Sequence, residues 1–169
     1  MIILGIDPGS NVTGYGLIAQ EGGRLRLLDA GAIRAGRGDA LPARLRLIHD
    51  ALAELLAQGN PGEMAVESVF AARNAHSALV LGHARGVALL AASLRDIPVV
   101  EYAPREVKLA LTGHGAAGKE QVRFMVQRLL ALPRPPASLD ASDALAIAIC
   151  HAQRRTAPQA ALPRRGGAR

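Results

Sequence analysis

Four acidic residues stand at the ends of apolar runs, a placement that suits carboxylates with a chemical role. The four are Asp7, Glu67, Asp140 and Asp143. A carboxylate is costly to bury without a partner, so several at the ends of core elements suggest a shared cation. Hard oxygen ligands, without a competing cluster of Cys or His, favour Mg²⁺ or Mn²⁺. Two such ions about 4 Å apart can activate a water and stabilise the leaving oxygen of a phosphodiester.

Each carboxylate also has an ordinary structural explanation. Asp7 precedes a Pro-Gly pair and would suit a turn, whereas Glu67 would suit the exposed end of a strand. Asp140 would suit a helix cap, and Asp143 would be a favourable charge in the first helical turn. One metal site explains all four positions together, and we therefore predict metal-assisted chemistry.

Three other residues are candidates for contact with a polyanion. The chain uses arginine 18 times but lysine only at Lys108 and Lys119, both in one segment. A lysine ammonium is a compact charge that can reach a phosphate or a proton-transfer site, although two solvated surface lysines would look the same. Phe70 follows Glu67 by three residues and would either stack on nucleic-acid bases or belong to the core.

The length and composition predict one domain with an aliphatic core. Half of the 169 residues are hydrophobic, but only 2% are aromatic. The single cysteine, Cys150, excludes an internal disulfide and is typical of a reducing compartment. No apolar run reaches about 18 residues, so we expect no membrane span and a cytoplasmic location.

The net charge of +6 is concentrated at the end of the chain. Residues 1–153 contain 15 Lys+Arg and 14 Asp+Glu, which leaves the other five positive charges to the last 16 residues. We predict a single domain over residues 1–153 and a basic, disordered tail over residues 154–169. That tail would either assist non-specific binding of polyanions or keep the chain soluble.

The hydrophobic pattern predicts a three-stranded meander followed by α/β crossovers. Strands are expected at residues 2–6, 13–19, 25–33, 64–69 and 99–102. Helices are expected from residue 41 to before 59, at 77–94, from 104, at 119–130 and at about 141–154. This order predicts an α/β fold with a mixed five-stranded sheet flanked by helices.

That topology would bring the acidic residues together. Strands one and four can lie parallel and adjacent, which places Asp7 and Glu67 at the carboxyl ends of neighbouring strands, where open α/β sheets bind ligands. Asp140 and Asp143 are three residues apart and therefore share one face of the last helix.

Small residues recur at four-residue spacing in the helix expected at 77–94. They are Ala78, Gly82 and Gly86. Such a row lets another element approach closely, either inside the domain or across a dimer contact.

Several segments together resemble the RuvC family of Holliday-junction resolvases over roughly residues 1–153. They include ILGIDPGS at 3–10, VTGYG at 12–16, ARGVA at 84–88 and DASDALAIA at 140–148. Glu67, Phe70, Asn74 and the segment at 77–82 also match. The combination is specific, whereas the Asp-x-Gly-Ser element alone is not.

The resemblance implies a ribonuclease-H-like fold and a homodimer that cuts two opposed strands of a four-way DNA junction with two Mg²⁺ or Mn²⁺ ions per site. It assigns metal binding and catalysis to the four carboxylates, and catalysis also to Lys119. The implied DNA-binding residues are Phe70, Arg73, Asn74, Lys108 and Lys119. Ala78, Gly82 and Gly86 match the family's dimer contact, and a branch-migration motor of the RuvA–RuvB type is the implied partner.

Two alternatives remain open at the level of sequence. The Asp-x-Gly-Ser element at Asp7 also resembles the first phosphate loop of actin-like and sugar-kinase ATPases. Those proteins need a second such loop, and the chain is about half the length that two lobes require. A non-catalytic junction-binding module is the other alternative, against which the intact carboxylates argue.

Overall fold

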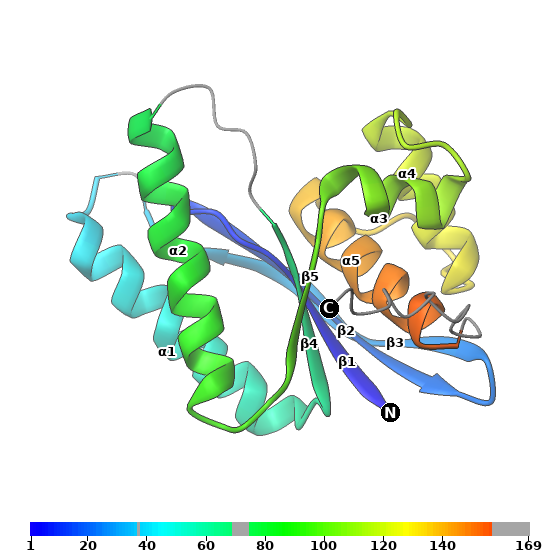
Figure 1. Cartoon of the computed structure of the whole chain (residues 1–169), viewed down its shortest axis with the longest axis horizontal. Helices are drawn as coiled ribbons and strands as arrows, with labels where there is room; N and C mark the ends of the chain where they lie inside the picture. The colour runs from blue at the N-terminus through cyan, green and yellow to red at the C-terminus, as the bar shows by residue number, and fades with distance from the viewer. Residues whose placement is uncertain (37, 69–74, 157–169) are drawn as a thin grey trace, which may run out of the picture.

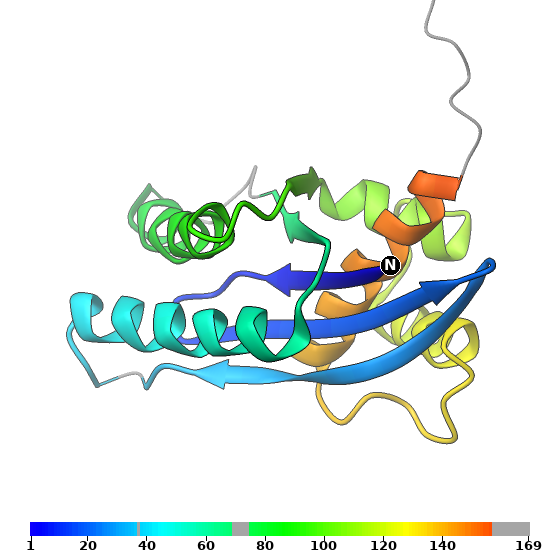
Figure 2. The same ribbon diagram turned by 90° about the horizontal axis from the view of Figure 1, so that it is seen from below.

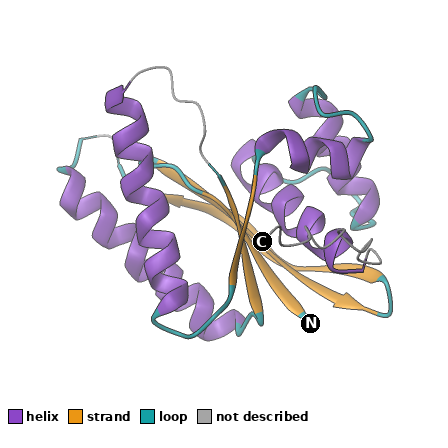
Figure 3. Cartoon of the chain, viewed as in Figure 1, coloured by secondary structure: helices purple, strands orange, loops and turns teal. Residues whose placement is uncertain are grey.

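Five strands form one mixed sheet in the computed structural model, which describes residues 1–36, 38–68 and 75–156 (Figures 1 and 3). Strand β1 (Ile2–Asp7) pairs antiparallel with β2 (Val12–Glu21), which pairs antiparallel with β3 (Arg24–Arg34). On its other side β1 pairs in parallel with β4 (Glu63–Glu67), and β4 with β5 (Val99–Tyr102). The order β3-β2-β1-β4-β5 confirms the predicted mixed sheet.

The helices form two layers, one on each face of the sheet (Figures 1 and 2). Helices α1 (Leu41–Gly59) and α2 (Ala75–Ser93) cover one face, and α3 (Pro104–Thr112), α4 (Lys119–Leu129) and α5 (Leu139–Thr156) cover the other. Each layer encloses its own buried hydrophobic cluster. The sheet therefore separates two aliphatic cores.

Strand alternation decides which side of the sheet carries the acidic residues. Ile6 and Val66 pack into the cluster under α1 and α2, whereas Ile3 and Ala65 pack into the cluster under α5. Successive side chains of a strand point to opposite faces. The residues that follow Ile6 and Val66, which are Asp7 and Glu67, therefore belong to the α5 face.

Glycines in β1 and β2 allow α5 to lie directly on the sheet. A Cβ added at Gly5 would lie 2.1 Å from the carbonyl oxygen of Ala144, and one at Gly14 would lie 2.2 Å from that of Asp140. Gly16, which pairs with Gly5, leaves room for Leu145. This close approach brings the first turn of α5 beside Asp7.

The last helix ends at Thr156, shortly after the end predicted at about residue 154, and the predicted domain boundary at residue 153 falls inside it. Arg154 and Arg155 are helical and form ion pairs with Glu106 and Glu63 respectively. Their charges are engaged in the fold and do not belong to a separate tail. Residues 157–169 lie outside the described part of the chain, as does the predicted end of the fourth strand at residue 69.

The small residues of α2 lie on its exposed side. Ala78, Gly82 and Gly86 are exposed, and a Cβ added at either glycine would meet no atom within 4 Å. Packing inside the domain therefore does not explain their spacing, because α2 buries a different set: Ala84, Ala88, Ala91 and Ala92.

Helix α2 also bears on the expectation of no membrane span. Among the described helices, α2 alone is long and apolar enough to cross a membrane by length and composition. Its mean hydropathy is 1.2, and 22% of its apolar stretch is buried in the fold. One such helix is weak evidence for a span, so the expectation of none stays a prediction.

Candidate active site

Asp7 and Glu67 end adjacent parallel strands at one edge of the sheet. Ile6 is paired with Val66 in the β1–β4 ladder, and the two acidic residues each come one position later. The backbone after Asp7 is held by Thr13, whose buried hydroxyl donates to the carbonyl oxygen of Gly9 at 2.8 Å and accepts from its N–H at 3.3 Å. This bracing, which sequence reasoning missed, fixes the loop beside Asp7.

A pocket of about 240 Å³ opens where these strands meet the last three helices. Its charged lining comes from β1, β4, α3, α4 and α5: Asp7, Glu67, Lys108, Lys119 and Asp143. Its apolar wall is formed by Pro104, Val107, Val122 and Ala146. Three of the four predicted acidic residues thus share one cavity, although Asp7 and Asp143 are 136 positions apart in the sequence.

Burial and neighbouring negative charge raise the proton affinity of Asp7 and Glu67. Burial, followed by the charges of Glu67 and Asp143, raises the pKa of Asp7 to about 7. Burial and the charge of Asp143 also raise the pKa of Glu67, and Lys119 and Lys108 oppose that change. Removing water and crowding like charges both disfavour ionised carboxylates. The pocket therefore has a strong demand for positive charge.

Lys119 supplies part of that charge. Its Nζ donates to Asp143 Oδ2 at 2.9 Å, and this hydrogen bond is the main cause of the raised pKa of the lysine. The lysine side chain is 65% exposed, whereas that of Asp143 is 25% exposed. Lys119 is thus fixed at one end of the pocket with its ammonium group still accessible to a substrate.

Asp140 is the one predicted acidic residue that does not line the pocket. It belongs to the first turn of α5, and its charge still contributes to the raised pKa of Asp7. Its backbone carbonyl oxygen packs directly against Gly14. Asp140 therefore lies at the edge of the acidic set.

The donors fit a divalent cation. All are carboxylate oxygens, and a cation would remove the repulsion that raises the pKa of Asp7. Within the described residues, however, no group of three or more His, Cys, Asp or Glu side chains is arranged to hold a metal ion as it stands. Asp143 points to Lys119 instead, so the side chains would have to turn toward a shared ion.

Three predicted DNA-binding residues cannot be related to this geometry. Phe70, Arg73 and Asn74 lie outside the described residues, between the end of β4 and the start of α2. The two predicted lysines, by contrast, both reach the pocket.

Comparisons with known proteins agree with one another. Residues 3–151 match the family model described as "Crossover junction endodeoxyribonuclease RuvC". The protein of that name from Sodalis glossinidius is 55% identical over 150 residues, which cover 89% of this chain and 86% of that protein. The protein of the same name from Granulibacter bethesdensis is 51% identical over 161 residues, which cover 94% of this chain and 88% of that protein.

Solved structures give the same result for the fold. A structure described as T. thermophilus RuvC in complex with Holliday junction substrate has a TM-score of 0.87 at 38% identity, covering 92% of this chain and 94% of that one. The structure of Thermus thermophilus RuvC has a TM-score of 0.83 at 39% identity, covering 90% and 93%. The predicted ribonuclease-H-like fold is confirmed, and neither the ATPase nor the non-catalytic alternative is favoured. With its carboxylate pocket at the end of β1 and β4, the chain belongs to the RuvC family of crossover junction endodeoxyribonucleases.

Proposed function

We propose that this protein resolves four-way DNA junctions by paired, metal-dependent nicks in opposed strands during recombination and DNA repair. The observation that carries the proposal is the pocket in which Asp7, Glu67 and Asp143 face two lysines. The Thermus thermophilus relative, described in complex with a Holliday junction substrate, supports the choice of DNA.

Mg²⁺ or Mn²⁺, two ions per site, would supply an activated water and stabilisation of the leaving oxygen. Asp7, Glu67, Asp140 and Asp143 would hold the ions. Lys119 would place its ammonium group beside the scissile phosphate, where it stabilises the negative charge that develops there. Lys108 would hold a neighbouring phosphate of the same strand, because it lines the pocket from α3.

The surroundings of the site complete the proposal. Phe70 would stack in the opened junction, and Arg73 and Asn74 would also bind the DNA. A second copy of the chain would pair through the exposed row of Ala78, Gly82 and Gly86. A branch-migration motor of the RuvA–RuvB type would be its working partner, in the cytoplasm.

A synthetic mobile junction, incubated with Mg²⁺ or Mn²⁺, tests the reaction. We expect paired nicks in opposed strands, little cutting of linear duplex, and none after chelation. Asp7→Asn should abolish cutting while junction binding in a gel-shift assay persists, because the charge that holds the ion is lost and the basic residues are unchanged. Asp39→Asn is the matched control, since Asp39 is exposed in the loop before α1. Wild-type nicking by Asp7→Asn would contradict the site, and no nicking by the wild type with any divalent ion would contradict the function.

A further inference from the structure

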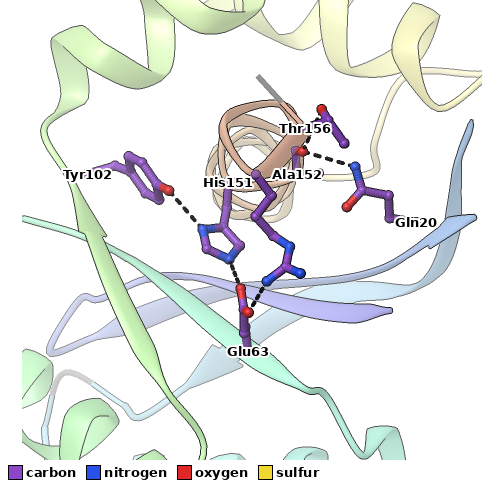
Figure 4. Close-up of polar contacts among 7 residues, drawn as sticks. Gln20, Glu63, Tyr102, His151, Ala152 and Thr156 are labelled. Atoms are coloured by element: carbon purple, nitrogen blue, oxygen red, sulfur yellow. Dashed lines mark hydrogen bonds and ion pairs between the residues drawn. The ribbon is translucent and has the colours of Figure 1, made fainter. Parts of the chain in front are cut away.

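A second polar cluster connects α5 to Glu63, at the start of β4, and to Tyr102, at the end of β5 (Figure 4). We call it the α5 anchor; it consists of Glu63, Tyr102, His151 and Arg155. His151 is only 3% exposed; its Nδ1 lies 2.8 Å from the Tyr102 hydroxyl and its Nε2 lies 2.5 Å from Glu63 Oε2. Arg155 forms an ion pair with the other carboxylate oxygen of Glu63. Together these residues tie α5 to β4 and β5.

A neutral histidine satisfies every group of the anchor. The Tyr102 hydroxyl then donates to Nδ1, Nε2–H donates to Glu63, and Arg155 balances the charge of that carboxylate. Burial lowers the pKa of His151, which favours the same neutral form. The anchor is therefore a fully paired, directional set of bonds.

The rest of the contact between α5 and the sheet has few such directional groups. Under the middle of α5 the sheet presents Gly5 and Gly16, and the helix presents Ala144, Leu145 and Ala148. Apolar packing is non-directional, so it holds the helix against the sheet without fixing its position along its axis. The directional bonds lie at the end of the helix, where Gln20 Nε2 also donates to the carbonyl oxygen of Ala152 at 2.9 Å (Figure 4).

The spacing along the helix matches the spacing along the strand. Glu63 and Glu67 are four strand residues apart, or about 13 Å. Asp143 and His151 are eight helical residues apart, or about 12 Å. The contact between His151 and Glu63 therefore keeps Asp143 at the same height along the sheet as Glu67. Both Asp143 and Glu67 line the pocket.

We propose that the α5 anchor is a positioning device for the carboxylate pocket: it fixes the axial position of α5 and thereby sets Asp143 against Glu67 for metal binding. His151 is its central positioning residue and touches neither substrate nor metal. The inference rests on the proposed function of the pocket as a metal site.

Direct Mn²⁺ binding to the full chain without DNA, followed by the electron paramagnetic resonance signal of free Mn²⁺, tests the proposal. His151→Phe keeps a ring and removes both hydrogen bonds, and Glu63→Leu removes the acceptor. Both should weaken Mn²⁺ binding on the order of tenfold, the low end of the loss that follows removal of groups orienting metal ligands. Glu63→Gln keeps an acceptor for Nε2–H and should retain wild-type affinity.

Loss of stability alone would not produce that pattern. Leu52→Ala removes a fully buried side chain of α1 on the other face of the sheet, and it serves as the destabilised control. It should lower the melting temperature at least as much as His151→Phe while Mn²⁺ affinity stays at the wild-type value. Equal Mn²⁺ affinities for His151→Phe and Leu52→Ala, measured where circular dichroism shows both folded, would overturn the anchor as a positioning device.

Junction cutting by the same variants separates the two proposals. If the wild type binds Mn²⁺ through Asp7 and cuts no junction, the proposed function fails while the anchor result stands. If the wild type cuts and His151→Phe binds Mn²⁺ as tightly as the wild type, the anchor alone fails. If the wild type binds no Mn²⁺, both are wrong.

Discussion

At Asp7, burial and the negative charges of its neighbours both oppose ionisation of the carboxyl group. Its pKa of about 7 in the folded protein compares with 3.8 for an exposed aspartate. Each pKa unit corresponds to about 1.4 kcal/mol, so this difference destabilises the metal-free folded state by about 4 kcal/mol at a pH where Asp7 is ionised in both the folded and the unfolded chain. The carboxylate that the chemistry needs is thus also a liability for folding.

Because the pKa of Asp7 is higher in the folded than in the unfolded protein, we predict that Asp7→Asn stabilises the metal-free protein. A raised folded-state pKa means that the native state holds its proton while the unfolded state has lost it, so stability falls as pH rises from about 4 to about 7. Asparagine has no such penalty. The advantage of Asp7→Asn should therefore be small near pH 4, grow to pH 7 and level off above it.

Urea unfolding in the presence of a chelator, at intervals from pH 4 to pH 8, measures this advantage. Asp39→Asn, an exposed substitution in the loop before α1, is measured in parallel as the control. A constant difference between Asp7→Asn and the wild type across the range would contradict the raised pKa.

The sequence predicted individual residues well where a strand end or a helix turn determines their position. Asp7, Glu67 and Asp143 meet because the parallel β1–β4 pair and the start of α5 bring them together. The anchor was not predictable in this way. Glu63 and His151 are 88 residues apart, and no spacing or motif relates them.

At the scale of elements, the fit of α5 on the glycines of the sheet determines the shape of the site. The sequence predicted the order of strands and helices, since hydrophobic period and turn residues mark them. It placed the end of the last helix at about Arg154 but did not predict the ion pairs of Arg154 and Arg155, because their partners Glu106 and Glu63 lie in distant elements. Arginines that precede a segment rich in Pro and Gly are readily assigned to a disordered tail when their ion-pair partners are unknown.

Gly5→Ala should disturb this fit. The added Cβ would meet backbone atoms of Ala144 and Ala148 in α5, which must move away. We expect a loss of about 1–3 kcal/mol in unfolding free energy, the usual range for overpacking, together with weaker Mn²⁺ binding. Gly38→Ala, with no atom within 4 Å of the added Cβ, should be near neutral. Wild-type values of both quantities for Gly5→Ala would show that α5 tolerates displacement.

At the scale of the molecule, α2 offers a surface on which a second copy would bind. Leu79 and Leu90 are 65% and 53% exposed on a helix whose small residues also face outward. Large apolar side chains exposed on one surface helix are typical of an interaction surface. The sequence suggested this contact only as one of two explanations, because periodicity cannot tell an inner face from an outer one.

Ala78→Glu should therefore convert a dimer into a monomer, since the new charge would be buried unpaired in the contact. Light scattering coupled to size exclusion measures the mass. Ala43→Glu, at an exposed alanine of α1, is the matched control and should leave the mass unchanged. A dimer that persists in Ala78→Glu would place the contact elsewhere.

The division of the fold by its sheet has a consequence for how the protein can change over evolutionary time. Every pocket-lining residue that the structure describes comes from β1, β4 or the layer of α3, α4 and α5. Helices α1 and α2 contribute none of them. If a second copy binds through α2 as proposed, substitutions that alter this pairing would change none of the described pocket-lining residues, so the pairing and the chemistry could evolve separately.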